Sequence, residues 1–324
     1  MAPQLFIHAG APRTATTALQ KSVFPNMRGI RYLGKLADNS TMPGEFKPLP
    51  VILDACARMQ AGDEQGLKVI RLVLPTVLTA LKRQNHAATG NDRREQLVRT
   101  FAGCLDAAAS CGGAPALFSD ESLIESISGV AANTARQDYV PLEQLHKIGF
   151  LERASLSVVL RDPAEFLRAS YYKAMEFRRR ARDPALSFDE YIRRQLEIYQ
   201  RAPSASRIFL CTHRAARRHL ARLCPRVVVT HYRDLVESRN VLDTLLGVST
   251  GEAPVALSDL PRENNSWRDE ASNAYILGAE GVPPGLNDVQ EYARTFPETL
   301  AKYELDQLFA ADAQSPDSPS NTQS

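Results

Sequence analysis

Five short apolar runs recur along the chain, separated by longer segments of mixed polarity. Each run is three to five residues long and lacks regular alternation with polar residues; they are Leu5–Ile7, Ala116–Phe118, Leu156–Leu160, Ile208–Leu210 and Val227–Val229. Short runs of this kind are typical of strands that are buried on both faces of a parallel sheet. We therefore predict a strand at each of the five positions.

Helical patterns lie between and after these runs. Apolar residues recur at helical spacing in two segments, at Phe188, Tyr191, Ile192, Leu196 and Tyr199 and again at Val241, Leu242, Leu245 and Leu246. Strands that alternate with helices favour a layered α/β fold. The expected architecture is a three-layer α/β/α domain with a central, mostly parallel sheet.

The domain boundaries follow from length and composition. The chain has 324 residues, which suits one large α/β domain. Residues 311–324 are rich in Ser, Pro, Asp, Asn and Gln and contain no aromatic residue, which is typical of a disordered tail. We expect a single domain over residues 1–310, followed by that tail.

Charge and cysteine content exclude several classes of protein. The chain has 39 Lys and Arg against 37 Asp and Glu, so the net charge of +2 gives no reason to expect a nucleic-acid partner. No apolar run is long enough to predict a membrane span, and no segment reads as a signal peptide. The five cysteines show neither a C-x-x-C pair nor zinc-ligand spacing, so we expect a cytoplasmic protein without a structural metal.

The segment "HAGAPRTATTALQ", from His8 to Gln20, stands where the first predicted strand passes into a helix. It combines a glycine, a proline, an arginine and three threonines. The first N–H groups of a helix have no partner within the helix, and the helix dipole adds partial positive charge there. Hydroxyl groups and a cation at the same place predict a site for a phosphate-like anion, built as a P-loop-like strand–turn–helix.

This segment departs from the P-loop of nucleotide kinases and ATPases, G-x-x-x-x-G-K-(S/T). With Gly10 as the first glycine, Ala15 takes the place of the second glycine and Thr16 that of the lysine. It resembles instead the 5′-phosphosulfate loop of sulfotransferases that use 3′-phosphoadenosine 5′-phosphosulfate (PAPS), G-x-P-(K/R)-(T/S)-G-(T/S)-(T/S)-x-L-Q. The matching residues are Gly10, Pro12, Arg13, Thr14, Thr16, Thr17, Leu19 and Gln20. Ala15 departs from the glycine that the family has at that position.

A second junction follows the third predicted strand, in "LSVVLRDPAEFLRASYY" from Leu156 to Tyr172. Asp162 is a typical N-cap, Pro163 suits the first helical position, and Glu165 completes a capping box. Arg161 has no such role. A cation between a buried strand and a helix start predicts a second anion site.

The second junction resembles the part of the same sulfotransferase family that binds the 3′-phosphate of PAPS. There an arginine acts together with a serine that usually lies eight residues later. Here Ala169 holds that position and Ser170 comes one residue after it. Weaker likenesses to the family are "LFSDESL" at Leu117–Leu123, "VVVTHYRDL" at Val227–Leu235 and "RENNSW" at Arg262–Trp267.

This resemblance implies transfer of a sulfonate group from PAPS to an acceptor hydroxyl or amine, with no metal. It places Arg13 beside the phosphosulfate and gives nucleotide contacts to Gly10, Pro12, Arg13, Thr14, Ala15, Thr16, Thr17, Arg161 and Ser170. Family members use a glutamate or a histidine as base, so Glu121 is the first candidate, His8 the second and His86 the third. The bacterial members suggest a carbohydrate acceptor.

Two other functions stay open. A P-loop nucleotide kinase or ATPase is disfavoured, because two defining positions are absent and Arg161 has no role in it. A catalytically inactive relative that only binds a nucleotide or a partner is supported by Ala15 and by the shifted Ser170.

Overall fold

A five-stranded sheet organises the chain, whose computed structural model describes residues 4–10, 16–35, 47–83, 91–135, 138–260 and 297–314. The strand order is β2-β3-β1-β4-β5, and every neighbouring pair is parallel. The strands are β1 (Leu5–His8), β2 (Arg31–Tyr32), β3 (Ala116–Ser119), β4 (Ala154–Leu160) and β5 (Val227–His231). The predicted α/β fold with a parallel sheet is confirmed.

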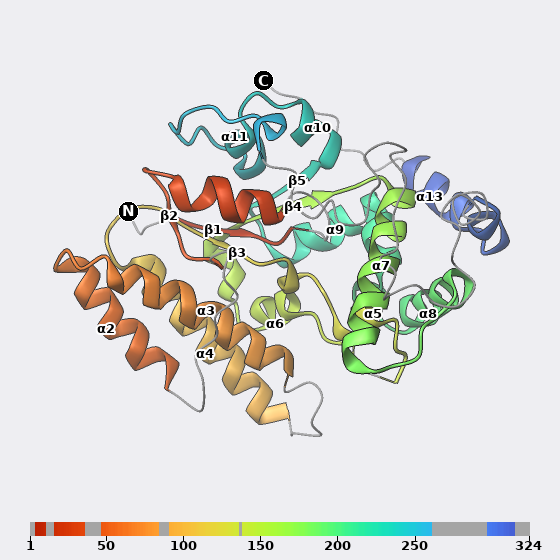
Figure 1. Cartoon of the computed structure of the whole chain (residues 1–324), viewed down its shortest axis with the longest axis horizontal. Helices are drawn as coiled ribbons and strands as arrows, with labels where there is room; N and C mark the ends of the chain where they lie inside the picture. Colours follow the sequence, from red (N-terminus) through yellow and green to blue (C-terminus); the bar gives the residue numbers. More distant parts are fainter. Residues whose placement is uncertain are drawn as a thin grey trace.

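Side chains from both faces of the sheet are buried, because helices cover each face. On β1, Leu5 and Ile7 join one core cluster and Phe6 joins the other. Figure 1 shows α2, α3 and α4 on one side of the sheet, and α10 and α11 with the helical turns that follow β1 on the other. The result is the predicted three-layer arrangement, and it explains why the strands are mostly apolar and lack regular alternation with polar residues.

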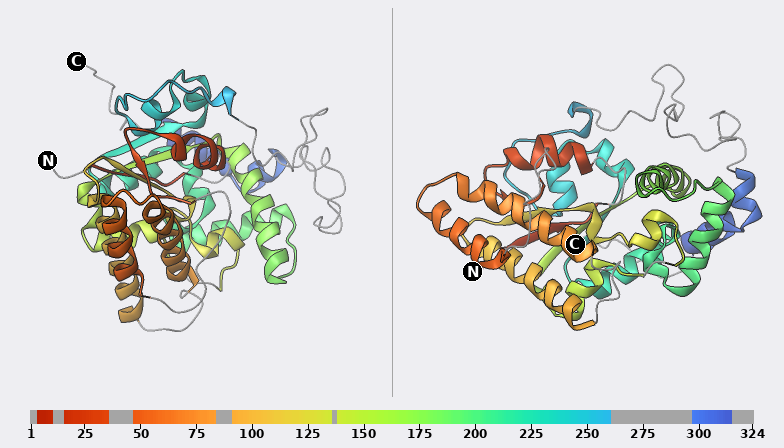
Figure 2. Two further views of the ribbon diagram at one scale, coloured as in Figure 1. Left: turned by 60° about the vertical axis from the view of Figure 1, so that its left-hand side comes forward. Right: turned by 60° about the horizontal axis from the view of Figure 1, so that its bottom comes forward.

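The helices differ widely in length. The longer ones are α2 (Pro48–Gln60), α3 (Gln65–Arg83), α4 (Asn91–Ser110), α7 (Pro163–Ala181), α8 (Phe188–Arg201), α9 (His213–Leu223) and α13 (Leu305–Gln314). The shorter ones are α1 (Thr16–Ala18), α5 (Ile127–Ala131), α6 (Pro141–Lys147), α10 (Tyr232–Glu237) and α11 (Val241–Leu246). Figures 1 and 2 show α7, α8 and α13 gathered at one end of the molecule, beyond the sheet.

The strand predicted at Ile208–Leu210 is wrong. These residues form part of η7 (Arg207–Cys211), a 3-10 helix that is capped by Ser206, whose side chain accepts a hydrogen bond from the Ile208 N–H. The run is fully buried, but its neighbours are α7, α8 and α9 rather than another strand. The apolar run correctly predicted that these residues are buried, but helices rather than strands bury them.

Three further features bear on the predictions: the end of α13, the state of the cysteines and the lengths of the helices. Helix α13 continues to Gln314, past residue 311, where we expected the tail to begin. All five cysteines are buried and free. None of the helices in the described ranges is both long and apolar enough to cross a membrane.

Candidate functional site

The carboxyl ends of three neighbouring strands bring the predicted site residues to one edge of the sheet. His8, at the end of β1, is in register with Ser119 on β3 and with Ser157 on β4. Gly10, Glu121 and Arg161 follow β1, β3 and β4 by one or two residues. Open α/β sheets bind their ligands at this edge, in the crevice between strands whose connections leave in opposite directions.

The β1–α1 junction is tightly packed around Gly10. A Cβ atom at Gly10 would lie 2.2 Å from Thr16 Oγ1 and 3.0 Å from His8 Cε1, so only glycine fits there without displacing a neighbour. Thr16 begins α1 and is 3% exposed, whereas Thr17 is half-buried. The other predicted residues of this loop, Pro12, Arg13, Thr14 and Ala15, lie outside the described residues.

A hydrogen-bond network fixes the helical turns after α1 to the end of β3. Gln20 Nε2 donates to Ser119 O at 3.2 Å and to Ser119 Oγ at 3.0 Å. His8 Nδ1 lies 2.9 Å from the same Oγ atom. Gln20, one of the residues that match the sulfotransferase loop, therefore bonds to the end of β3, and Ser119 in turn contacts His8 at the end of β1.

His8 fits a structural role better than the role of a base. Its ring is 0% exposed and packs edge-on against Phe24, with 5.7 Å between the ring centroids. Burial lowers the pKa of His8 to about 4, so the imidazole is neutral at neutral pH and is a weak proton acceptor. The third candidate base, His86, lies outside the described residues.

The β4–α7 junction has the N-cap and the first-turn proline that the sequence predicts, but not the reciprocal half of the capping box. The Asp162 side chain accepts a hydrogen bond from the Glu165 N–H at 3.0 Å, and Pro163 is the first residue of α7. The Glu165 carboxylate turns to Arg161, whose Nε and Nη2 donate to Oε2 at 2.9 and 2.7 Å. The Arg161 side chain is 12% exposed, and its guanidinium lies 5.2 Å from the centroid of the Tyr232 ring.

Ser170 has a different environment from Arg161. It is 2% exposed on α7, and its hydroxyl lies beside Tyr191 of α8 in the core. A phosphate contact from Ser170 stays a prediction, and Arg161 is the better placed of the two.

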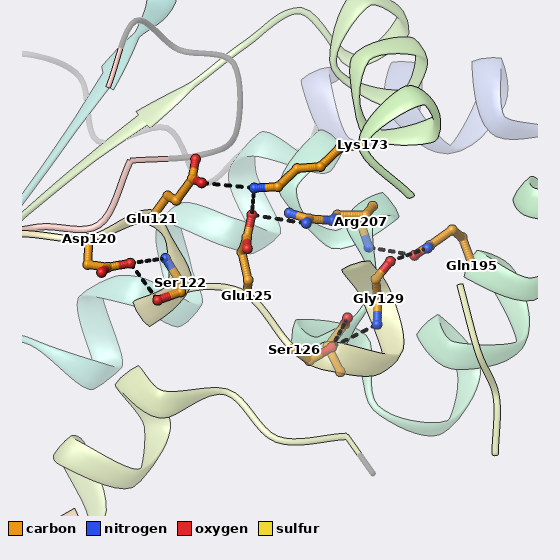
Figure 3. Close-up of polar contacts among 10 residues, drawn as sticks. Asp120, Glu121, Ser122, Glu125, Ser126, Gly129, Lys173, Gln195 and Arg207 are labelled. Carbon is orange, nitrogen blue, oxygen red and sulfur yellow. Dashed lines mark hydrogen bonds and ion pairs between the residues drawn. The ribbon is translucent and has the colours of Figure 1, made fainter. Parts of the chain in front are cut away.

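Glu121 belongs to a charged cluster that sequence reasoning did not find. It begins η4 (Glu121–Leu123), its side chain is 32% exposed, and its Oε1 lies 3.0 Å from Lys173 Nζ on α7. Figure 3 shows Lys173 between Glu121 and Glu125, with Arg207 reaching the same oxygen of Glu125. Lys173 lies 3.0 Å from Glu125 Oε1, as does Arg207 Nη2. No local motif marks Lys173, Glu125 or Arg207, because their partners are distant in the sequence.

The neighbouring carboxylate, Asp120, is turned away from this cluster. It is 1% exposed and accepts a hydrogen bond from the Ser122 N–H at 2.9 Å. Its other oxygen lies 3.1 Å from Lys35 Nζ, and this carboxylate is the main reason why the pKa of Lys35 is raised. Asp120 thus caps η4 and leaves Glu121 as the more accessible acid.

Comparisons with known proteins add little to this geometry. No protein-family model matches the chain, and no curated protein matches it. Among solved structures, the crystal structure of a sulfotransferase from Alicyclobacillus acidocaldarius matches over 96% of both chains, with 14% identity and a TM-score of 0.37. The α/β assignment rests on the sheet itself.

Proposed function

We propose that this chain is a PAPS-dependent sulfotransferase, which moves a sulfonate group from PAPS to an acceptor hydroxyl or amine, with a carbohydrate as the expected acceptor. One observation supports this most strongly. The two junctions that resemble the phosphate-binding segments of the family follow neighbouring strands, β1 and β4, at the same edge of the sheet. A nucleotide with anionic groups at its 5′ and 3′ positions needs two such sites side by side.

Four groups of predicted residues have a chemical role in this proposal. Arg13 and the threonines of the first junction bind the 5′-phosphosulfate and stabilise the charge that grows on the leaving oxygen. Arg161 binds the 3′-phosphate. Glu121 takes the proton of the acceptor while a new bond forms between the acceptor atom and sulfur. The bond from sulfur to the bridging phosphate oxygen breaks, and adenosine 3′,5′-bisphosphate leaves with that electron pair.

An inactive relative that binds a nucleotide is the second candidate. Two observations favour it: Ala15 replaces the family's glycine, and Ser170 is buried in the core. A nucleotide kinase has less support, because the P-loop lysine and second glycine are absent from the segment.

Calorimetric titration with adenosine 3′,5′-bisphosphate tests the proposal, because it needs no knowledge of the acceptor. We expect micromolar binding of the bisphosphate and weak binding of ATP. Arg161→Ala should weaken bisphosphate binding by about tenfold to a hundredfold, since a charge-assisted hydrogen bond contributes about 1.5–3 kcal/mol.

The matched control is Arg99→Ala. Arg99 also pairs with a glutamate one helical turn away, at 2.7 Å, but lies exposed on α4. This variant should bind the bisphosphate like the wild type. Absence of bisphosphate binding in the wild type would refute the proposal, and tight ATP binding would favour the kinase.

A further inference from the structure

A pocket lies where α8, η7, α9 and the 3-10 helix η6 (Pro203–Ala205) meet. Its volume is about 680 Å³, which is within the range of small-molecule sites. Part of its lining is apolar or aromatic, with Tyr199 from α8, Pro203 from η6 and Phe209 from η7. Most of the remaining lining comes from α9, including Arg218 and Arg222. None of the lining residues belongs to the two junctions at the sheet edge.

The α9 side of this pocket is strongly basic. Helix α9 contains four arginines, two histidines and no acidic residue. Arg218 and Arg222 are one helical turn apart, so they lie on the same face of the helix, and both are exposed. Arg222 Nε donates to Arg218 O at 3.4 Å, and no carboxylate in the part of the chain that the structure describes pairs with Arg222. Two neighbouring guanidinium groups favour an anionic ligand.

One carboxylate stands behind the lining, and residues of the pocket already engage it. Glu143 Oε1, on α6, lies 3.1 Å from His219 Nε2, and Ser204 also hydrogen-bonds to the Glu143 side chain. The His219 ring packs edge-on against Phe209, with 5.3 Å between the ring centroids. Glu143 therefore supports the aromatic part of the pocket, and Arg222 stays available to a ligand.

We propose that this pocket binds a small anion that carries a ring, of the class of aromatic phosphate and sulfate esters. The charged group would bind at Arg218 and Arg222. The ring would pack against Tyr199 and Phe209, since aromatic side chains favour stacked or edge-on contacts with another ring.

The inference goes beyond the proposed function, because the pocket is separate from the sheet edge. Helix α9 begins at that edge, where His213 Nε2 lies 2.9 Å from Arg161 O. Arg222 lies nine residues further along the helix, which corresponds to about 14 Å at 1.5 Å per residue. The pocket is thus a second site, and its ligand need not compete with a nucleotide.

The test is an NMR titration of the alanine methyl groups in the full chain with phenyl phosphate. Ala215 lines the pocket, whereas Ala9 follows β1 at the sheet edge. Their signals are assigned by their loss in Ala215→Gly and Ala9→Gly. We expect a saturable shift of the Ala215 signal. Inorganic phosphate, which lacks the ring, and phenol, which lacks the charge, should each bind about fivefold more weakly or worse.

Arg222→Met should weaken the binding of phenyl phosphate by about fivefold to tenfold, at the low end for a charge-assisted hydrogen bond because this side chain is exposed to salt. The matched control is Arg217→Met, which removes the same charge from an exposed position of α9 outside the lining. It should bind phenyl phosphate like the wild type.

Three results would overturn the inference. They are a shift of the Ala9 signal without one of Ala215, wild-type affinity in Arg222→Met, and binding of phosphate or phenol as tight as that of phenyl phosphate. Because no nucleotide is present, the titration is independent of bisphosphate binding, whose absence would instead refute the proposed function.

Discussion

The close packing at Gly10 leads to a sharp prediction about the strand–helix turn. In Gly10→Ala the new Cβ would lie 2.2 Å from Thr16 Oγ1 and 3.1 Å from His8 Nε2. Overpacking of this kind costs about 1–3 kcal/mol, whereas alanine restricts the unfolded chain and returns about 0.4–1 kcal/mol. We expect a net loss of about 1–2 kcal/mol in the free energy of unfolding, together with weaker binding of the bisphosphate.

Urea unfolding followed by far-UV circular dichroism measures this loss, and Gly103→Ala is the control. A Cβ at Gly103, within α4, would meet no atom within 4 Å. That substitution should stabilise the protein by about 0.5–1 kcal/mol, because glycine is a poor helix former. The two alanine variants should therefore shift the unfolding midpoint in opposite directions.

A double-mutant cycle with Thr16→Ala isolates the contact itself. Removal of Oγ1 takes away the nearest atom to the new Cβ, so Gly10→Ala should cost less in that background by about 1 kcal/mol. Additive effects of the two substitutions, or a Gly10→Ala protein as stable as the wild type, would show that the turn is not packed as described.

Two further predictions concern the candidate bases. Glu121→Gln should leave bisphosphate affinity unchanged and lower turnover about a hundredfold or more, measured as bisphosphate release from PAPS with a carbohydrate panel; full turnover would move the role to His8 or His86. Because burial lowers the pKa of His8 to about 4, the unfolded chain binds a proton there below about pH 6.5 and the folded chain does not. Between pH 6.5 and 4, the free energy of unfolding of the wild type should fall by about 3 kcal/mol more than that of His8→Gln, as measured by urea unfolding. The same pH dependence in both proteins would contradict this.

The sheet was largely predictable because its strands are buried on both faces. β1, β3, β4 and β5 all read as apolar runs, and the structure places each within one to two residues of its predicted bounds. The run at Ile208–Leu210 has the same composition but is buried among helices, and composition alone does not distinguish the two environments. β2 has only two residues, Arg31 and Tyr32, which is too short to show any periodicity.

In the candidate site, the features formed by consecutive residues were predictable, and those formed by residues distant in the sequence were not. Its two junctions were predictable, because a strand end, a cap and a cation are consecutive residues, as at Arg161 and Asp162. Lys173 and Arg207 were not, since they lie 52 and 82 residues from the glutamates that they contact. Only the packing of α7 and η7 against the segment after β3 brings these charges together.

The ion pair at the second junction raises the question of whether Arg161 is available to a nucleotide. Its partner Glu165 lies one helical turn away and is 48% exposed. Ion pairs at this helical spacing contribute about 0.3–0.5 kcal/mol when exposed, and the half-exposed Glu165 keeps this pair weak; a charge-assisted hydrogen bond of the kind expected with a phosphate contributes about 1.5–3 kcal/mol. A 3′-phosphate would therefore outcompete Glu165 for the guanidinium. Until it binds, Glu165 holds the Arg161 side chain against Tyr232, which reduces the entropy that nucleotide binding must overcome. The structural role of Arg161 and its proposed role in binding are thus compatible.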